Sequence, residues 1–331
     1  MNTMGWLVKR EYWEHRGGFL WTPVWVSGVM IVLTIFGIIS AEVVGSRVRV
    51  NGGVPWERIA ERLNAGDFVQ AGAGLDVAYV ALTAIMFIAL FFVLFFYLLG
   101  SLYDDRRDRS VLFWKSLPVS DTATVLSKIA AALLLAPLLA FLVATVAFIV
   151  LLIVVCIWAA IHGIDPLPAI GASHPVGLFA RLLLTIPVNA LWALPTVGWL
   201  MFWSAYSRSK PFLWAVLVPI FALIANSWLS VLGAPSLDRS FLMKDVLARL
   251  LFGIAPVSWL NGEGLNLGDS VGDSFRDSAG VGGHSNVLDK FDPAAVYGML
   301  ATPAMWIGVV VGIGLIAISI WLRRSRIETS T

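Results

Sequence analysis

Charged residues are scarce in this sequence. Asp, Glu, Lys and Arg make up 13% of the 331 residues, about half of the ~25% usual in soluble domains. Apolar residues make up 59%. The composition therefore excludes an ordinary soluble globular protein and predicts a polytopic membrane protein.

Cysteine and histidine are also few. Cys156 is the single cysteine and lies inside an apolar run, so neither a disulfide nor a cysteine metal site is expected. The four histidines, His15, His162, His174 and His284, are scattered over three regions. The sequence therefore predicts no metal site.

A phosphate-binding loop is missing too. The glycine pairs at 262–264 and 282–283 are not followed by the Lys-Ser/Thr that such a loop requires. The chain is expected to have no ATPase activity, no catalytic residue and no cofactor of its own. Its net charge of +2 does not indicate a nucleic-acid partner.

Six apolar runs are long enough to cross a bilayer, which takes about 20 residues. They cover 20–41, 77–102, 126–160, 177–203, 212–232 and 296–322. We therefore predict an all-α polytopic membrane protein, with residues 19–331 forming one six-span domain. The third run is too long for one perpendicular helix, so it is expected to tilt or to extend beyond the bilayer.

Residues 1–18 mix charges with aromatic side chains. Trp6, Leu7, Tyr12 and Trp13 stand among acidic and basic residues, a pattern typical of an amphipathic helix lying at a membrane surface. Gly17-Gly18 is expected to end this interfacial helix. A frayed polar terminus is the alternative.

The distribution of basic residues predicts the orientation, because Lys and Arg are enriched in cytoplasmic loops. With both termini in the cytoplasm, thirteen of the 23 basic residues fall on the cytoplasmic side. These are Lys9, Arg10, Arg16, Arg106, Arg107, Arg109, Lys115, Lys128, Arg208, Lys210, Arg323, Arg324 and Arg326.

Two segments then lie on the outer side, 45–76 and 233–295. The first has a possible short helix at 55–63. In the second, the apolar spacing over 238–251 predicts a helix at the outer interface, and 261–286 is rich in Gly, Asp and Ser and is typical of a loop.

The interiors of the spans offer few polar groups. Thr34, Thr83, Asn226 and Ser227 are candidates to line a path, although helix packing is an alternative use. The ionisable residues closest to span interiors, Glu42 and Arg181, fall near predicted outer ends. This pattern argues against a proton-driven carrier.

The stretch 103–121 is a charged island between two spans, and it contains the apolar run Val111-Leu112-Phe113-Trp114. One interpretation is a helix that docks into a partner's groove. The other is a charged connector anchored by interfacial aromatics. Ser120 and Asp121 are a suitable start for the third span, because serine caps helix amides and aspartate suits the positive end of the dipole.

The run from Arg106 to Ser120, followed by Thr124-Val125-Leu126-Ser127-Lys128, resembles the loop between spans two and three of bacterial ABC-2-type ABC transporter permeases. In that family the loop is a coupling helix that docks on a separate ATPase subunit. The resemblance implies that this chain is the permease subunit of an ATP-driven exporter in the bacterial inner membrane. The residues assigned to ATPase contact are Arg106, Arg109, Val111, Leu112, Phe113, Trp114 and Lys115.

The resemblance further implies two ATPase subunits, which would carry ATP and Mg, and a second permease chain, either identical or related. Membrane lipid is the remaining expected partner. Two other functions stay open from the sequence: a membrane scaffold or sensor that binds a different protein through the island, and a secondary carrier.

Overall fold

The computed structural model describes residues 3–47, 68–108, 119–233, 235, 237–238, 241–255 and 291–325. Within these ranges the chain forms helices and no strand. Six of the helices are long and apolar enough to cross a membrane. The predicted all-α polytopic membrane fold is therefore confirmed.

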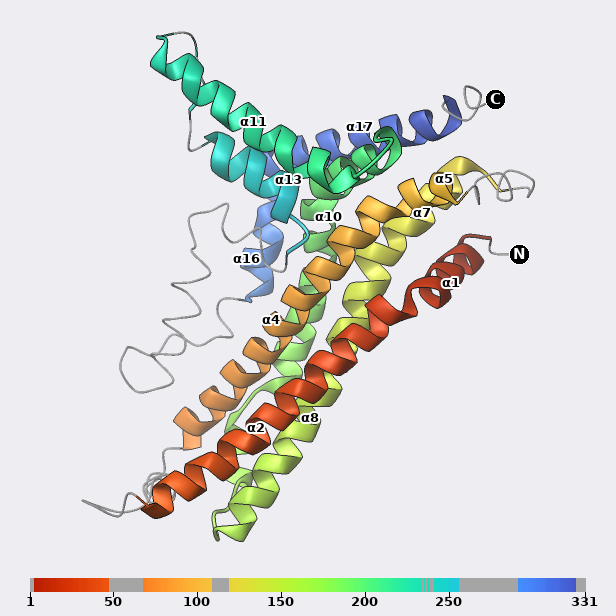
Figure 1. The fold of residues 1–331 in the computed structure, drawn as a ribbon. Coiled ribbons are helices and arrows are strands. Elements are labelled where there is room, and N and C mark those ends of the chain that lie inside the picture. Colours follow the sequence, from red (N-terminus) through yellow and green to blue (C-terminus); the bar gives the residue numbers. More distant parts are fainter. Residues whose placement is uncertain are drawn as a thin grey trace.

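The first half of the chain forms three long helical rods. In chain order its elements are α1 (Thr3–Arg16), the π-helical turn η1 (Gly17–Trp21), α2 (Thr22–Arg47), α4 (Phe68–Ser101), α5 (Tyr103–Arg107), α7 (Asp121–Ala130), the π-helical turn η2 (Ala131–Leu135) and α8 (Ala136–Ile161). Figure 1 shows that α2, α4 and α8 run side by side, with α1, α5 and α7 at one end of the bundle.

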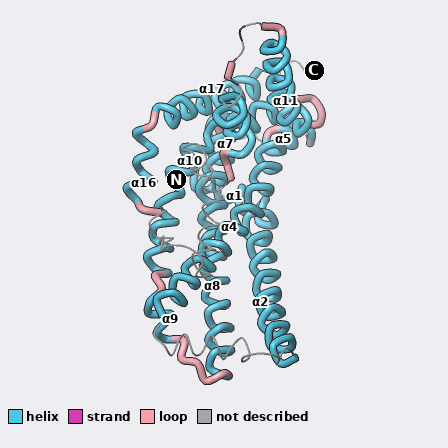
Figure 2. The backbone as a smooth tube through the Cα atoms, turned by 90° about the vertical axis from the view of Figure 1, so that its left-hand side faces the viewer, coloured by secondary structure: helices cyan, strands magenta, loops and turns pink. Residues whose placement is uncertain are grey.

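The second half adds the remaining spans. Its elements are α9 (Leu167–Ala172), α10 (Pro175–Tyr206), α11 (Pro211–Val231), the π-helical turn η3 (Leu242–Ala248), α13 (Arg249–Phe252), α16 (Pro293–Gly298), the 3₁₀ turn η5 (Met299–Ala301) and α17 (Pro303–Ser325). Figure 1 shows α11 projecting away from the other helices, and both ends of the chain near α5 and α7. Figure 2, turned by 90°, shows α9 at the opposite end of the bundle.

Helices α10 and α17 cross at small residues. A Cβ atom added to Gly198 would lie 2.7 Å from the carbonyl oxygen of Gly312, and one added to Gly312 would lie 2.5 Å from the carbonyl carbon of Leu194. These neighbours are backbone atoms that cannot rotate away. The two glycines therefore set how closely spans four and six approach each other.

The predicted end of the first helix at Gly17-Gly18 is wrong, because the chain continues helically through η1. The irregularity lies instead at His15, whose φ of −112° and ψ of 19° depart from helical values. A Cβ at Gly18 would lie 2.8 Å from the Val93 side chain of α4. This glycine thus serves close packing within a continuing helix and does not end it.

Other boundaries differ in informative ways. Helix α4 begins at Phe68, before the predicted start at 77, and the last span begins at Pro303 after the short helix α16. The third run is one continuous helical rod from Asp121 to Ile161, interrupted only by η2. The helix predicted over 238–251 is observed from Phe241 to Phe252. The predicted helix at 55–63 and the loop at 261–286 lie outside the described residues.

Candidate functional site

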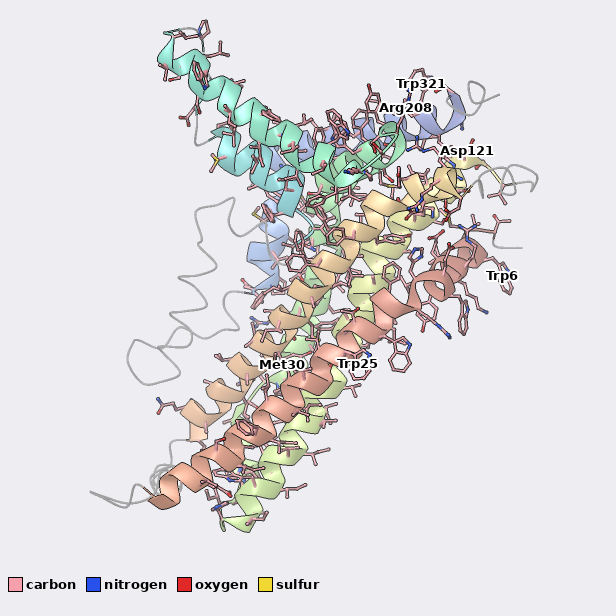
Figure 3. The ribbon with its side chains drawn as sticks, viewed as in Figure 1. Trp6, Trp25, Met30, Asp121, Arg208 and Trp321 are labelled. Carbon is pink, nitrogen blue, oxygen red and sulfur yellow. The ribbon has the colours of Figure 1, made fainter. Side chains whose placement is uncertain are left out.

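Charged side chains from four segments meet at the end of the bundle that carries both chain ends. The segments are α1, α5, α7 and the last turn of α17. We call this cluster the charge network; its members are Glu11, Asp105, Asp121, Lys128 and Arg323. Figure 3 shows Asp121 at this end of the molecule, with Trp6 on α1 and Trp321 on α17.

Lys128 lies at the centre of the charge network. Its Nζ is 3.5 Å from Glu11 Oε1 and 3.6 Å from Asp105 Oδ1, and its side chain is only 2% exposed. Glu11 is fully buried, and the hydroxyl of Tyr97 donates a hydrogen bond of 2.9 Å to its second oxygen. The cation of the third span thus ties α1 to α5.

Glu11 also pairs with the neighbouring Arg10. Its position in α1 is outside the apolar run that begins at Leu20. Burial raises the pKa of its carboxyl. Lys128, Arg10 and the Tyr97 hydroxyl together lower the pKa by more than burial raises it, so the pKa of Glu11 lies below its ordinary value. Glu11 is therefore an anion at neutral pH, and the charge network is ionic.

Arg323 connects the last span to the same network. Its Nη1 is 3.1 Å from Asp105 Oδ2, its Nε donates to Asp121 Oδ1 at 3.0 Å, and its side chain is 4% exposed. Asp105 lies near the start and Asp121 at the end of the predicted docking segment, residues 103–121. One guanidinium therefore holds both flanks of the predicted docking segment.

The start of α7 has the predicted cap. The Ser120 hydroxyl accepts a hydrogen bond of 3.1 Å from the backbone N–H of Ala123, and Asp121 lies in the first helical turn. The third span is thus capped at its first helical residue. This prediction from the sequence is confirmed.

Arg106, predicted to contact an ATPase, is engaged within the chain. Its Nη2 donates to the carbonyl oxygens of Ser204 at 2.6 Å and Ser207 at 3.0 Å, at the end of α10. The Ser204 hydroxyl in turn accepts hydrogen bonds of 3.0 Å from the N–H groups of Leu102 and Tyr103. Arg106 therefore fixes α5 to span four, because helix ends present carbonyls without helical partners.

The remaining residues assigned to ATPase contact lie outside the described residues: Arg109, Val111, Leu112, Phe113, Trp114 and Lys115.

The four candidate path residues are not brought together. Thr83 lines a small cavity of about 60 Å³ with Thr185 and Asn189. Thr34 donates to the Met30 carbonyl.

The other two path candidates lie on α11. The amide of Asn226 exchanges two hydrogen bonds of 2.9 Å with the backbone of Leu237, and the Ser227 hydroxyl donates to the Leu223 carbonyl. Asn226 thus holds the chain that leaves span five. A single path lined by all four residues is not formed by this arrangement.

The interpretation from sequence missed Arg249, on the helix between spans five and six. Its guanidinium lies 3.8 Å from the centre of the Trp192 ring and donates to the carbonyls of Ala304 and Met305 at the start of α17. A Cβ at Gly308 would collide with it. The sequence offered only a basic residue beside Leu250 and Leu251 and the Gly308–Gly312 spacing, and neither identifies these carbonyls as its partners.

One set of side chains has the spacing of metal ligands. Glu11, Glu14 and His15 each place one ligand atom within 4.8 Å of the others, and the i, i+4 spacing of Glu11 and His15 was overlooked in the sequence. However, Lys128 and Arg10 already neutralise Glu11. The chemistry of the cluster is that of an ion-pair network, and we assign it no metal.

Comparison of the chain with models of protein families, with curated proteins and with solved structures finds no match. The functional argument therefore rests on the geometry of the charge network and on the resemblance carried by the island.

Proposed function

We propose that this chain is the membrane-spanning permease subunit of an ATP-driven ABC exporter. In this proposal residues 103–121 form the coupling loop that docks on a separate ATPase subunit. Two ATPase copies would bind ATP and Mg, and a second permease chain, identical or related, would complete the transporter. The membrane would be the bacterial inner membrane, with both termini in the cytoplasm.

The observation that supports this proposal most is the anchoring of both flanks of the docking segment to several spans. Asp105 on the first flank and Asp121 on the second share Arg323 of α17. Arg106 binds the end of α10, and Lys128 brings in α1. A surface loop without a mechanical role does not require so many buried ion pairs, which are costly to desolvate.

The mechanism follows from these contacts. A displacement of the docking segment moves Asp121, and with it the rigid rod of α7 and α8. Arg323 transmits the same displacement to α17, Arg106 to α10, and the Lys128–Glu11 pair to α1 and α2. Closure of the ATPase subunits on ATP would thereby shift the ends of several spans together, which is the kind of bistable rearrangement that opens a path.

The experiment that tests this proposal is purification of the tagged full chain in mild detergent from its native membrane. We expect a stoichiometric ATPase subunit to accompany it. Phe113→Ala with Trp114→Ala should release that subunit, because aromatic anchors dominate such interfaces. Trp228→Ala, on an exposed tryptophan of α11, is the control and should leave the complex intact.

Three results would contradict the proposal. Recovery of a stoichiometric partner without ATPase activity would favour the scaffold or sensor, and retention of the ATPase by the double variant would remove the docking role of 103–121. Substrate accumulation driven by an ion gradient without any partner would favour a secondary carrier.

A further inference from the structure

A continuous apolar groove lies between α2 and α8. Its volume is about 430 Å³, and its walls include Leu20, Ser27 and Ile31 on one side and Leu139, Val146 and Val150 on the other. The one hydroxyl among these, Ser27, already donates to the Pro23 carbonyl at 2.7 Å. The groove therefore offers nothing to a polar ligand and fits a hydrocarbon chain.

The groove has the length of one leaflet. The chain positions from Leu20 to Ile31 correspond to about 16 Å of helix at ~1.5 Å per residue, and half of a ~30 Å hydrocarbon core is about 15 Å. Both walls run in the same direction from the end that carries the charge network. The groove thus begins where a lipid headgroup region would lie and ends near the bilayer centre.

Two cations stacked on tryptophans lie on α1, the helix that leads into the α2 wall of the groove. Lys9 Nζ lies 4.9 Å from the centre of the Trp6 ring, and the Arg16 guanidinium lies 5.9 Å from that of Trp13. All four residues are exposed; Trp6, Lys9 and Trp13 belong to the regular part of α1, and Arg16 follows the irregularity at His15. Arg16 precedes Leu20 by about one helical turn.

These pairs have the chemistry of a site for an anionic headgroup. Tryptophan prefers the membrane interface, and exposed lysine and arginine attract anionic lipids. The exposed acid of α1, Glu14, has Arg10 within 3.9 Å. Lys9 and Arg16 are exposed cations of α1 that a phosphate at this membrane surface could reach, and Arg16 is the one nearer to the groove in the chain.

We propose that this chain binds one anionic phospholipid, with an acyl chain in the α2–α8 groove and its phosphate at Arg16 and Lys9. The proposal does not depend on the transport function. The bound lipid would fill the space between the first and third spans and hold α1 at the membrane surface.

Gly28 provides a sharp test, because it lines the groove and a Cβ there would meet nothing within 4 Å. Gly28→Leu should fill the groove without disturbing the helix. The full chain would be purified with dioleoylphosphatidylglycerol or dioleoylphosphatidylcholine, and retained lipid would be counted by native mass spectrometry. We expect the wild type to keep one phosphatidylglycerol and Gly28→Leu to lose it by about tenfold or more, because several methylenes lose their buried site.

Gly37→Leu is the matched control, since Gly37 also lies on α2 and faces open space but does not line the groove. It should retain lipid like the wild type. Lys9→Gln with Arg16→Gln should lower the preference for the anionic lipid by about fivefold per cation. Arg208→Gln with Lys210→Gln, at exposed positions between α10 and α11, should not.

Three results would overturn the proposal: equal retention of both lipids by the wild type, equal retention by Gly28→Leu and Gly37→Leu, or a dimer that Gly28→Leu dissociates. The last would mean that a second copy of the chain occupies the groove. Thermal unfolding of each variant would show that lost lipid does not reflect lost folding.

Discussion

The ammonium of Lys128 lies 3.5 Å from the carboxylate of Glu11, and both side chains are buried almost completely. Glu11 belongs to the leader helix and Lys128 to the beginning of the third span. The pair therefore joins α1 to α7. If α1 were only an amphipathic helix on the membrane surface, it would not need a buried contact with the third span. It makes α1 part of the charge network at the ends of α5, α7 and α17.

Lys128→Met should destabilise the protein strongly. It would leave the buried Glu11 and the partly buried Asp105 without their shared cation, and the loss of one partner from a buried ion pair typically costs about 3 kcal/mol. The measurement is the free energy of unfolding in detergent. Arg324→Gln, at an exposed position on α17, is the control and should change stability by less than about 0.5 kcal/mol.

A double variant, Glu11→Gln with Lys128→Met, separates pairing from packing. It should be more stable than Lys128→Met alone, because a neutral amide tolerates burial better than a carboxylate that has lost one of its two cations. Equal stability of the two variants would mean that Asp105, rather than Glu11, is the partner that matters.

Arg106→Gln should loosen α5 from the end of α10. A charged hydrogen bond to a carbonyl contributes about 2 kcal/mol, and this guanidinium makes two such bonds with Ser204 and Ser207. Exchange of the α5 amide hydrogens should become faster. Arg107→Gln changes an exposed neighbour and should leave the exchange rates as they are; a similar effect of both variants would show that charge alone is responsible.

Gly198→Ala should push span six away from span four. The added methyl would meet the backbone of α17, and overpacking of this kind costs about 1–3 kcal/mol. Gly314→Ala is a matched control on α17, because a Cβ there meets open space. The control should be neutral or slightly stabilising. A lower unfolding midpoint for Gly198→Ala than for Gly314→Ala would show that the close approach of α10 and α17 requires glycine.

Ser120→Ala should fray the beginning of the third span. It removes the hydroxyl that accepts from Ala123, a loss of about 1 kcal/mol, and Ser120→Asp should restore the cap. Limited proteolysis around residue 120 would follow the fraying. Equal cleavage of the alanine and aspartate variants would argue that the cap is not what holds this end.

Local features could be predicted from the sequence. The apolar runs predict all six spans, because the length and composition of a helix are enough to identify it as a candidate membrane span. The cap at Ser120 follows from residue type and position. The helix over 238–251 follows from its apolar spacing. These properties depend on residues close together in the chain.

Contacts between distant segments could not be predicted in this way. Nothing near Glu11 in the sequence indicates that Lys128 would be its partner, and nothing near Arg249 indicates the carbonyls of α17. Arg106 illustrates the same limit, because an exposed arginine and one bound to the end of α10 have the same sequence neighbours. The two glycines after Arg16 indicated a helix end, whereas packing against α4 explains Gly18.

The π-helical turns η1 and η2 separate α1 from α2 and α7 from α8. Successive residues of an α-helix are rotated by about 100° around its axis. Each backbone hydrogen bond of a π-helical turn spans five residues instead of four, so the turn contains one extra residue. The extra residue sets the rotational phase between the end that carries Glu11 and Lys128 and the spans below. Loss of one residue from either turn would rotate one partner away from the other while leaving the hydropathy of the chain unchanged.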